Sequence, residues 1–334
     1  MSLAYGDFLA PLGYFDPLAH PIPPVPLPSP KRILWGADPF LRSRLLAAIQ
    51  HEAGNRRQSV TAVYDPLLSD RIVAISGDSI GALTLSQHQL RGNEKLIDCN
   101  ALLPPDCDTI LGQAEAIARQ RNQLAAEIAS VGKAISSHRS LLTGVSRKLC
   151  DAPSLQAKIQ RIAKQIPKGD GWESALPIFT RKSGKAVHLP FPPGESVRFI
   201  ELQDVYGIAT LFLEDLSRTL AEKKAHRILL TCALTDEPMG ILLPAQGVCY
   251  LKQIGSTLPC KKLPMRRYLS AHTTEERRAW RNLAVSVSAL ERHLDRLLDA
   301  YRNLAKEEDA LRVSLYNESR LQNFRKRLLI DLFC

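Results

Sequence analysis

The sequence predicts an α/β fold built from two similar modules, each with a parallel sheet and long helices. Two observations support this prediction. Short apolar segments rich in β-branched residues alternate with amphipathic helical segments, and the same order of segments occurs twice along the chain. Because strands that alternate with helices are typical of parallel sheets, we expect one module over residues 1–167 and a second over residues 168–334.

The repeated unit begins with a strand, a polar turn and a helix. This order is found in KRILWGADPFLRSRLLAAIQ, which begins at Lys31, and again in SVRFIELQDVYGIATLFLEDLS, which begins at Ser196. Further along, residues 59–75 and 227–243 each hold two apolar runs around an acidic turn. We interpret these short apolar runs as buried strands.

Both modules continue into long helices. In the first, apolar residues recur at helical spacing within residues 109–166, and Pro153 predicts a break between two helices. In the second, a heptad stripe runs from Leu283 to Leu304 within a helical region over 274–330. The stripe either joins two chains or packs against the chain's own first helices. We favour the second, because each module carries helices that need an apolar partner.

The composition is that of a globular chain with a basic balance. The chain has 334 residues, 45% of them hydrophobic, and Lys+Arg exceed Asp+Glu by 44 − 34 = 10. A basic balance favours polyanionic partners such as nucleotides, nucleic acid or a membrane surface. Because the basic residues are mostly spread along the chain, the sequence does not favour specific nucleic-acid binding.

A basic amphipathic stretch, RLQNFRKRLLIDLF, occupies residues 320–333. Such a helix either lies on an anionic membrane or a partner, or packs on the core with its basic face in solvent. We favour the second interpretation.

The sequence also bears on location and redox state. No apolar run is long enough to span a membrane and the N-terminal residues do not form a secretory signal, so we expect no transmembrane segment and a cytoplasmic location. The seven cysteines are odd in number and lack a CxxC pair, which favours reduced thiols over disulfides or a zinc site.

The turn after the first strand is similar in layout to a phosphate-binding loop, G-x-x-x-x-G-K-[ST]. Gly36 provides the first glycine and Ser43 the hydroxyl, but Leu41 replaces the second glycine and Arg42 replaces the lysine. Arg42 keeps the positive charge, whereas Leu41 disfavours a positive φ. The candidate nucleotide-binding residues are Gly36, Asp38, Arg42, Ser43 and Arg44, with Ser43 as the candidate Mg²⁺ ligand.

The second loop is altered further. In the aligned segment over residues 202–210, Ile208 occupies the position of the lysine, so the phosphate-binding charge is missing. Asp204, Gly207 and Thr210 remain as the candidate residues of this degenerate loop.

Acids that could hold a metal ion are few near the predicted strand ends. Asp65 is the best placed in the first module, and Asp236 and Glu237 are the best placed in the second. These acids either hold a metal beside the phosphates or end strands in turns. We favour turns, because Asp before Pro commonly initiates one.

With these features together, the chain resembles the bacterial tandem P-loop ATPase-like proteins, which carry two P-loop modules in one chain. The resemblance covers most of the chain. It rests on the segment PLGYFD at residues 11–16, the position of the loop, the Asp65-Pro66 turn and the long helices after each module. It implies two P-loop NTPase-like modules that bind ATP and Mg²⁺. The family's loops are typically a full G-x-x-G-x-G-K-[ST] in both halves, and both loops here depart from that pattern.

Three functions follow from these observations. We expect a degenerate P-loop NTPase-like protein with weak or no ATP hydrolysis, acting as a regulatory or partner-binding scaffold, because both loops are altered. The first alternative is an ATPase with an atypical loop, in which Arg42 replaces the lysine and Ser43 binds magnesium. The second is a binder of nucleic acid or membrane through a basic surface. No catalytic residue is assigned.

Overall fold

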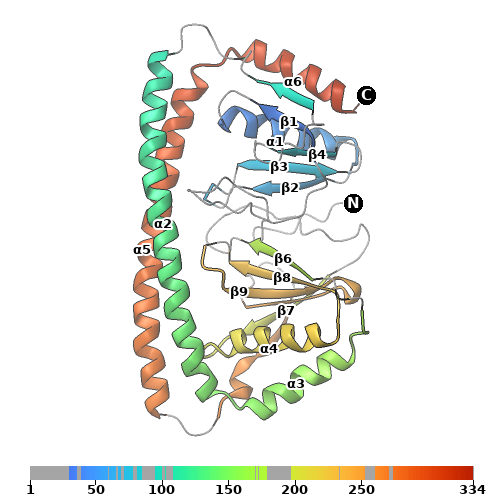
Figure 1. Cartoon of the computed structure of the whole chain (residues 1–334), viewed down its shortest axis with the longest axis vertical. Helices are drawn as coiled ribbons and strands as arrows, with labels where there is room; N and C mark the ends of the chain where they lie inside the picture. The colour runs from blue at the N-terminus through green and yellow to red at the C-terminus, as the bar shows by residue number, and fades with distance from the viewer. Residues whose placement is uncertain are drawn as a thin grey trace. The chain divides into compact units, whose positions relative to one another are not determined.

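A computed structural model gives the chain a mixed α/β fold with six α-helices among the described residues (Figure 1). The structure describes residues 30–35, 39–58, 60–64, 67–68, 71–77, 81–84, 95–99, 102, 108–169, 171, 173–178, 197–232, 234–252, 260–270 and 274–333. Contacts within the chain divide it into two units. The first is built mainly from Ala10–Ala129 and Arg296–Cys334, and the second mainly from Ser130–Asp295. The boundary predicted between residues 167 and 168 concerns the repeated segments, and it stays a prediction.

The first unit contains a five-stranded sheet with the strand order β2-β3-β4-β1-β5. Strand β1 is parallel to both of its neighbours, β4 and β5, whereas β2, β3 and β4 pair antiparallel. The elements are β1 (Pro30–Trp35), α1 (Pro39–Asn55), β2 (Val60–Tyr64), β3 (Ile72–Gly77), β4 (Gly81–Thr84) and β5 (Lys95–Asp98).

The second unit contains a six-stranded sheet with the order β11-β7-β10-β9-β8-β6. Strand β7 is parallel to β10 and β11, while β10, β9 and β8 pair antiparallel and β6 is parallel to β8. The elements are α3 (Ala152–Lys164), β6 (Glu173–Ile178), β7 (Arg198–Gln203), α4 (Ile208–Glu222), β8 (Arg227–Cys232), β9 (Pro238–Leu243), β10 (Val248–Leu251), β11 (Cys260–Pro264) and short 3-10 turns at Pro244–Gln246 and Met265–Tyr268.

The expectation of parallel sheets was wrong, because both sheets are mixed. In the first unit only residues 65–71 join β2 to β3, and only residues 78–80 join β3 to β4. A parallel crossover needs a dozen or more residues, so such short connections force neighbouring strands to run antiparallel. The two sheets nevertheless share a pattern, in which the strand before the predicted loop lies between two parallel neighbours.

Three further helices are α2 (Asp108–Leu149), α5 (Thr274–Val313) and α6 (Glu318–Phe333), and α2 and α5 contribute residues to both units. The predicted break at Pro153 is confirmed, since α2 ends at Leu149 and α3 begins at Ala152. The Asp151 carboxylate starts α3 by accepting a hydrogen bond from the Ser154 backbone N–H at 3.2 Å.

The heptad stripe of α5 is partly buried inside the chain. Leu294, Leu297 and Tyr301 are buried. In the first unit the Arg121 guanidinium of α2 lies 5.5 Å from the centre of the Tyr301 ring. The favoured interpretation, in which the stripe packs on the chain's own helices, agrees with these contacts.

The core of the second unit lies between its sheet and the helices α3 and α4 (Figure 1). Strand β7 buries Phe199 and Leu202, and β10 is buried at all four positions. From α4, the fully buried Phe212 meets Tyr250 of β10, with ring centres 5.7 Å apart. This packing fixes the position of the loop that joins β7 to α4.

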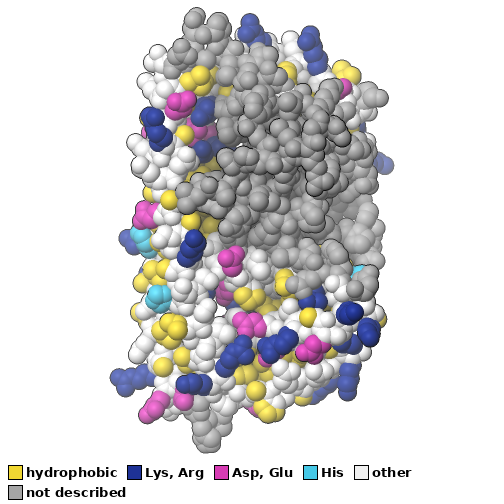
Figure 2. Space-filling view, viewed as in Figure 1, with side chains coloured by type: hydrophobic (Ala, Val, Ile, Leu, Met, Phe, Trp, Pro, Cys, Tyr) yellow, Lys and Arg dark blue, Asp and Glu magenta, His cyan; other side chains and the backbone are white. Residues whose placement is uncertain are grey.

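No helix in the described part of the chain is long and apolar enough to cross a membrane. The five cysteines that the structure describes form no disulfide. In the view of Figure 2, Lys and Arg side chains occupy many separate positions on the described surface, with Asp and Glu side chains among them.

The C-terminal helix α6 packs on the first sheet's core through Leu321, Leu328 and Leu332. Its basic residues Arg325 and Lys326 are exposed. This agrees with the favoured interpretation of residues 320–333, a helix on the core with a solvated basic face.

Leu328→Ala should therefore lower the free energy of unfolding by about 2–4 kcal/mol, because Leu328 is 5% exposed and its removal leaves a cavity. The control is Ile330→Ala on the same helix, where the side chain is 61% exposed and the expected change stays within about 0.5 kcal/mol. Chemical denaturation of the full chain measures both, and equal effects would show that α6 is not docked.

Candidate functional site

The loop between β7 and α4 has an unusual backbone that its own residues hold in place. Tyr206 and Gly207 have φ values of 55° and 75°, both in the left-handed region. Gly207 is also crowded, since a Cβ there would lie 2.5 Å from the Ser146 hydroxyl oxygen. A glycine is therefore required here, both for its backbone conformation and for the close approach of helix α2.

The chain itself satisfies the first backbone donors of α4. A helix N-terminus normally presents N–H groups without partners inside the helix, and these are the groups that bind phosphate in P-loops. Here the Ala209 N–H donates to the Asp204 carboxylate at 2.8 Å. The Ile208 N–H donates to the Val205 carbonyl at 3.3 Å, and the Thr210 N–H donates to the carbonyl of the N-cap residue Gly207 at 3.1 Å. The Leu211 N–H makes the first regular helical bond, to the same Gly207 carbonyl at 3.5 Å.

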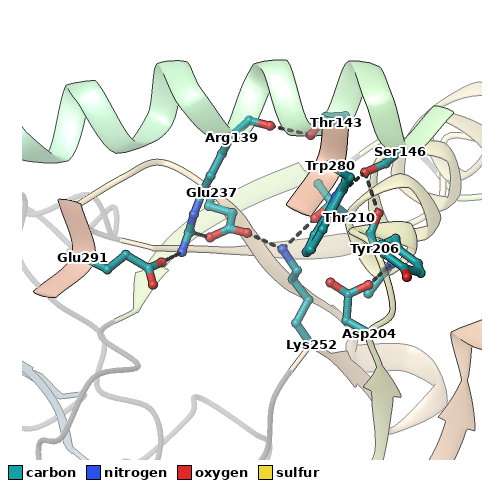
Figure 3. Close-up of polar contacts among 11 residues, drawn as sticks. Arg139, Thr143, Ser146, Asp204, Tyr206, Thr210, Glu237, Lys252, Trp280 and Glu291 are labelled. Atoms are coloured by element: carbon teal, nitrogen blue, oxygen red, sulfur yellow. Dashed lines mark hydrogen bonds and ion pairs between the residues drawn. The ribbon is translucent and has the colours of Figure 1, made fainter. Parts of the chain in front are cut away.

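Helices α2 and α5 cover this loop within the second unit (Figure 3). The Ser146 hydroxyl from α2 donates to the Tyr206 carbonyl at 2.6 Å and accepts from the Trp280 indole N–H of α5 at 3.2 Å. The rings of Tyr206 and Trp280 meet edge to face with their centres 5.2 Å apart. These contacts clamp the loop from two neighbouring helices.

A network of alternating charges lies beside the loop (Figure 3). The Lys252 ammonium, one residue beyond β10, donates to the Thr210 hydroxyl at 2.6 Å and pairs with Glu237. Glu237 also pairs with Arg139 from α2, and Arg139 in turn pairs with Glu291 from α5. One carboxylate, that of Glu237, thus lies between two cations.

Burial lowers the pKa of Lys252 to about 8, and the neighbouring Asp204 carboxylate acts in the opposite direction. Removal from water disfavours an ammonium, so its anionic partners are needed to keep it charged. At neutral pH the Lys252 side chain is therefore predominantly a cation.

Lys252, Glu237, Arg139 and Thr210 line a cavity of about 650 Å³. Its charged residues are nearly balanced, and they are Arg139, Arg147, Lys252, Asp204, Glu214, Asp236 and Glu237. Arg147 and Glu214 pair at 2.8 Å. The wall also includes Thr235, which is 5% exposed and whose hydroxyl has no hydrogen-bond partner among the described residues.

The structure brings together the three residues that the sequence predicted for the second loop. Asp204, Gly207 and Thr210 all line the cavity. Of the acids considered, Asp236 lies in the turn between β8 and β9 with a φ of 52°, and Glu237 pairs with Lys252.

Sequence reasoning missed the residues that complete the site: Arg139, Ser146, Lys252, Trp280 and Glu291. For Lys252 a signal was present, because it directly follows β10, the strand that aligns with β4 of the first module. The others lie on α2 and α5, and helical periodicity alone does not show which of their polar positions face the loop.

The predicted residues of the first loop are only partly placed. Gly36, Asp38 and Asp65 lie outside the described residues. Arg42 is in α1 but its side chain lies outside the description, and Arg44 is exposed on the same helix. Ser43 is buried, and its hydroxyl oxygen accepts a hydrogen bond from the Ile72 N–H at 3.0 Å. The roles predicted for these residues stay predictions.

The second loop does not fit a nucleoside triphosphate with magnesium. Its helix N–H groups are used internally, Gly207 is covered by Ser146, and the Thr210 hydroxyl is bound by Lys252. No known family model, curated protein or solved structure matches the chain.

Gly207→Ala should lower the free energy of unfolding by about 2–4 kcal/mol, because a left-handed alanine and the contact with Ser146 each cost ~1–3 kcal/mol. Combining it with Ser146→Ala removes the contact, so we expect the double variant to be about 1 kcal/mol more stable than the sum of the two single effects. Thermal and denaturant unfolding measure this coupling.

Gly144→Ala is the matched control, since a Cβ at this helical glycine meets no atom within 4 Å. It should stabilise the chain by about 0.5–1 kcal/mol through helix propensity. A Gly207→Ala variant as stable as Gly144→Ala would contradict the clamped loop.

Proposed function

We propose that the chain is a degenerate P-loop NTPase-like protein with weak or no ATP hydrolysis that acts as a regulatory or partner-binding scaffold. One observation carries the proposal. The donors that would hold phosphate at the start of α4 are already bonded to the chain's own atoms, with Asp204 accepting from Ala209. A phosphate could gain those hydrogen bonds only by breaking existing ones, which removes most of the binding free energy.

The shared pattern of the two sheets supports an origin in two tandem P-loop-like modules. In each, the strand before the predicted loop lies between two parallel strands, and two antiparallel strands follow on one side. Fold does not fix function, so this similarity supports the architecture and not hydrolysis.

Exposed apolar side chains on the helices of the second unit support a role in protein binding. Leu141 on α2 is 59% exposed and Val285 on α5 is 67% exposed. The contacts of Arg139 with Glu291 and of Ser146 with Trp280 bracket these two positions, so they belong to the same stretch of the helix pair. A contiguous apolar patch is typical of a surface for a partner, and Leu141 and Val285 are the candidate positions for one on this helix pair.

The test is ATP hydrolysis by the purified full chain, with and without magnesium, for the natural sequence, Arg42→Ala and Lys252→Met. We expect phosphate release at the level of the protein-free control in all samples. Magnesium-dependent release that disappears in Arg42→Ala would contradict the proposal and establish the alternative, an ATPase that uses Arg42 and Ser43 in the first loop.

A further inference from the structure

We propose that the cavity beside the second loop binds the oxyanion of a small molecule, a phosphate or carboxylate group, which takes the place of the Glu237 carboxylate between Lys252 and Arg139. This inference rests on the proposed function and extends it, because it assigns a ligand class to a site that does not perform hydrolysis. In the apo state Glu237 acts as a tethered anion that the ligand displaces.

The first support is the convergence of two cations on one carboxylate in the cavity wall. Lys252 follows strand β10 and Arg139 lies on helix α2, so separate elements position the two charges. The guanidinium and the ammonium together present several donors to a single oxyanion, which is the arrangement that recognises phosphate and carboxylate groups.

Each of the two cations has a second partner besides Glu237. Arg139 keeps its pair with Glu291, and Lys252 keeps its hydrogen bond to the Thr210 hydroxyl at 2.6 Å. Glu237 itself belongs to the short connection between β8 and β9, next to Asp236 with its φ of 52°. Its side chain can therefore rotate away without disturbing a helix, and the cations remain oriented toward the vacated position.

The second support is independent of the charges. Thr235 lines the same cavity and its hydroxyl, at 5% residue exposure, has no hydrogen-bond partner among the described residues. A buried hydroxyl without a partner costs free energy, and a ligand oxygen in the cavity would remove that cost. Thr235 thus supplies an additional donor for the ligand.

The cavity is large enough for more than an isolated anion. Its volume of about 650 Å³ falls within the range of roughly 300–1,000 Å³ that small-molecule sites occupy. Trp280 and Val287 also line it and provide apolar area for the rest of the ligand. The space therefore accommodates a small organic molecule that carries the oxyanion.

The experiment titrates the full chain with inorganic phosphate and, separately, with acetate, by calorimetry at an ionic strength held constant with sodium chloride. Glu237→Gln removes the competing anion, so phosphate should bind this variant about tenfold more tightly than the natural chain. Glu214→Gln is the matched control, because it neutralises another carboxylate of the same cavity that pairs with Arg147 instead. It should change the affinity by about twofold at most.

Lys252→Met in the Glu237→Gln background should abolish binding, and Thr235→Val in that background should weaken it several-fold. The variant with both Glu237→Gln and Lys252→Met removes both charges of one ion pair. Its thermal unfolding transition, compared with that of the natural chain, checks that it is folded. Tighter binding of phosphate than of acetate assigns a phosphate-bearing ligand, and the reverse assigns a carboxylate-bearing one.

Two results would overturn the inference: no saturable binding of either anion to Glu237→Gln, or equal binding to Glu237→Gln and Glu214→Gln. The titrations contain neither nucleotide nor magnesium. A failure of the proposed function appears separately, as ATP hydrolysis.

Discussion

The structure of the second unit depends on how the N-terminus of α4 is satisfied. A helix must find partners for its first N–H groups, and in a P-loop a ligand can supply them. Here Asp204 and the loop carbonyls supply them, which requires the left-handed backbone at Tyr206 and Gly207. That backbone brings the loop close enough to α2 for Ser146 to bond the Tyr206 carbonyl. The hydrogen bonds that satisfy the N-terminus of α4 and the contact of α2 with the loop therefore depend on the same backbone conformation.

The charged side chains beside the loop also find their partners within the same unit. Lys252, Glu237, Arg139 and Glu291 come from a strand end, a turn and two helices, yet they form a neutral set. Partly buried charges need partners, and here Arg139 and Lys252 each have a second one besides Glu237, in Glu291 and Thr210. The network thus links the sheet to α2 and α5 inside this unit, with Glu237 paired to both cations from the connection between β8 and β9.

Much of this fold follows from the sequence, whereas the site follows only in part. The strand, loop and helix around Asp204 and the break at Pro153 are local, so spacing and turn chemistry reveal them. The direction of β3 and β9 depends on the length of the connections before them. The alternation of strands with helices, on which the prediction of parallel sheets rested, does not take that length into account. Lys252 and Arg139 reach the loop through tertiary packing, and no local pattern in the sequence encodes that contact. The aligned lysine position, Ile208, was correctly identified as lacking charge, but Lys252 returns a cation to the same helix end from another strand.

The most direct test of the satisfied loop is amide hydrogen exchange at residues 208–211, measured with and without millimolar ATP and magnesium. We expect the Ala209 amide to be protected in the free protein, because its N–H donates to the Asp204 carboxylate at 2.8 Å. We also expect nucleotide to leave the protection of all four amides unchanged. Rapid exchange in the free protein that slows when ATP is added would show that these donors are open and bind phosphate, and it would contradict a loop whose donors are already satisfied.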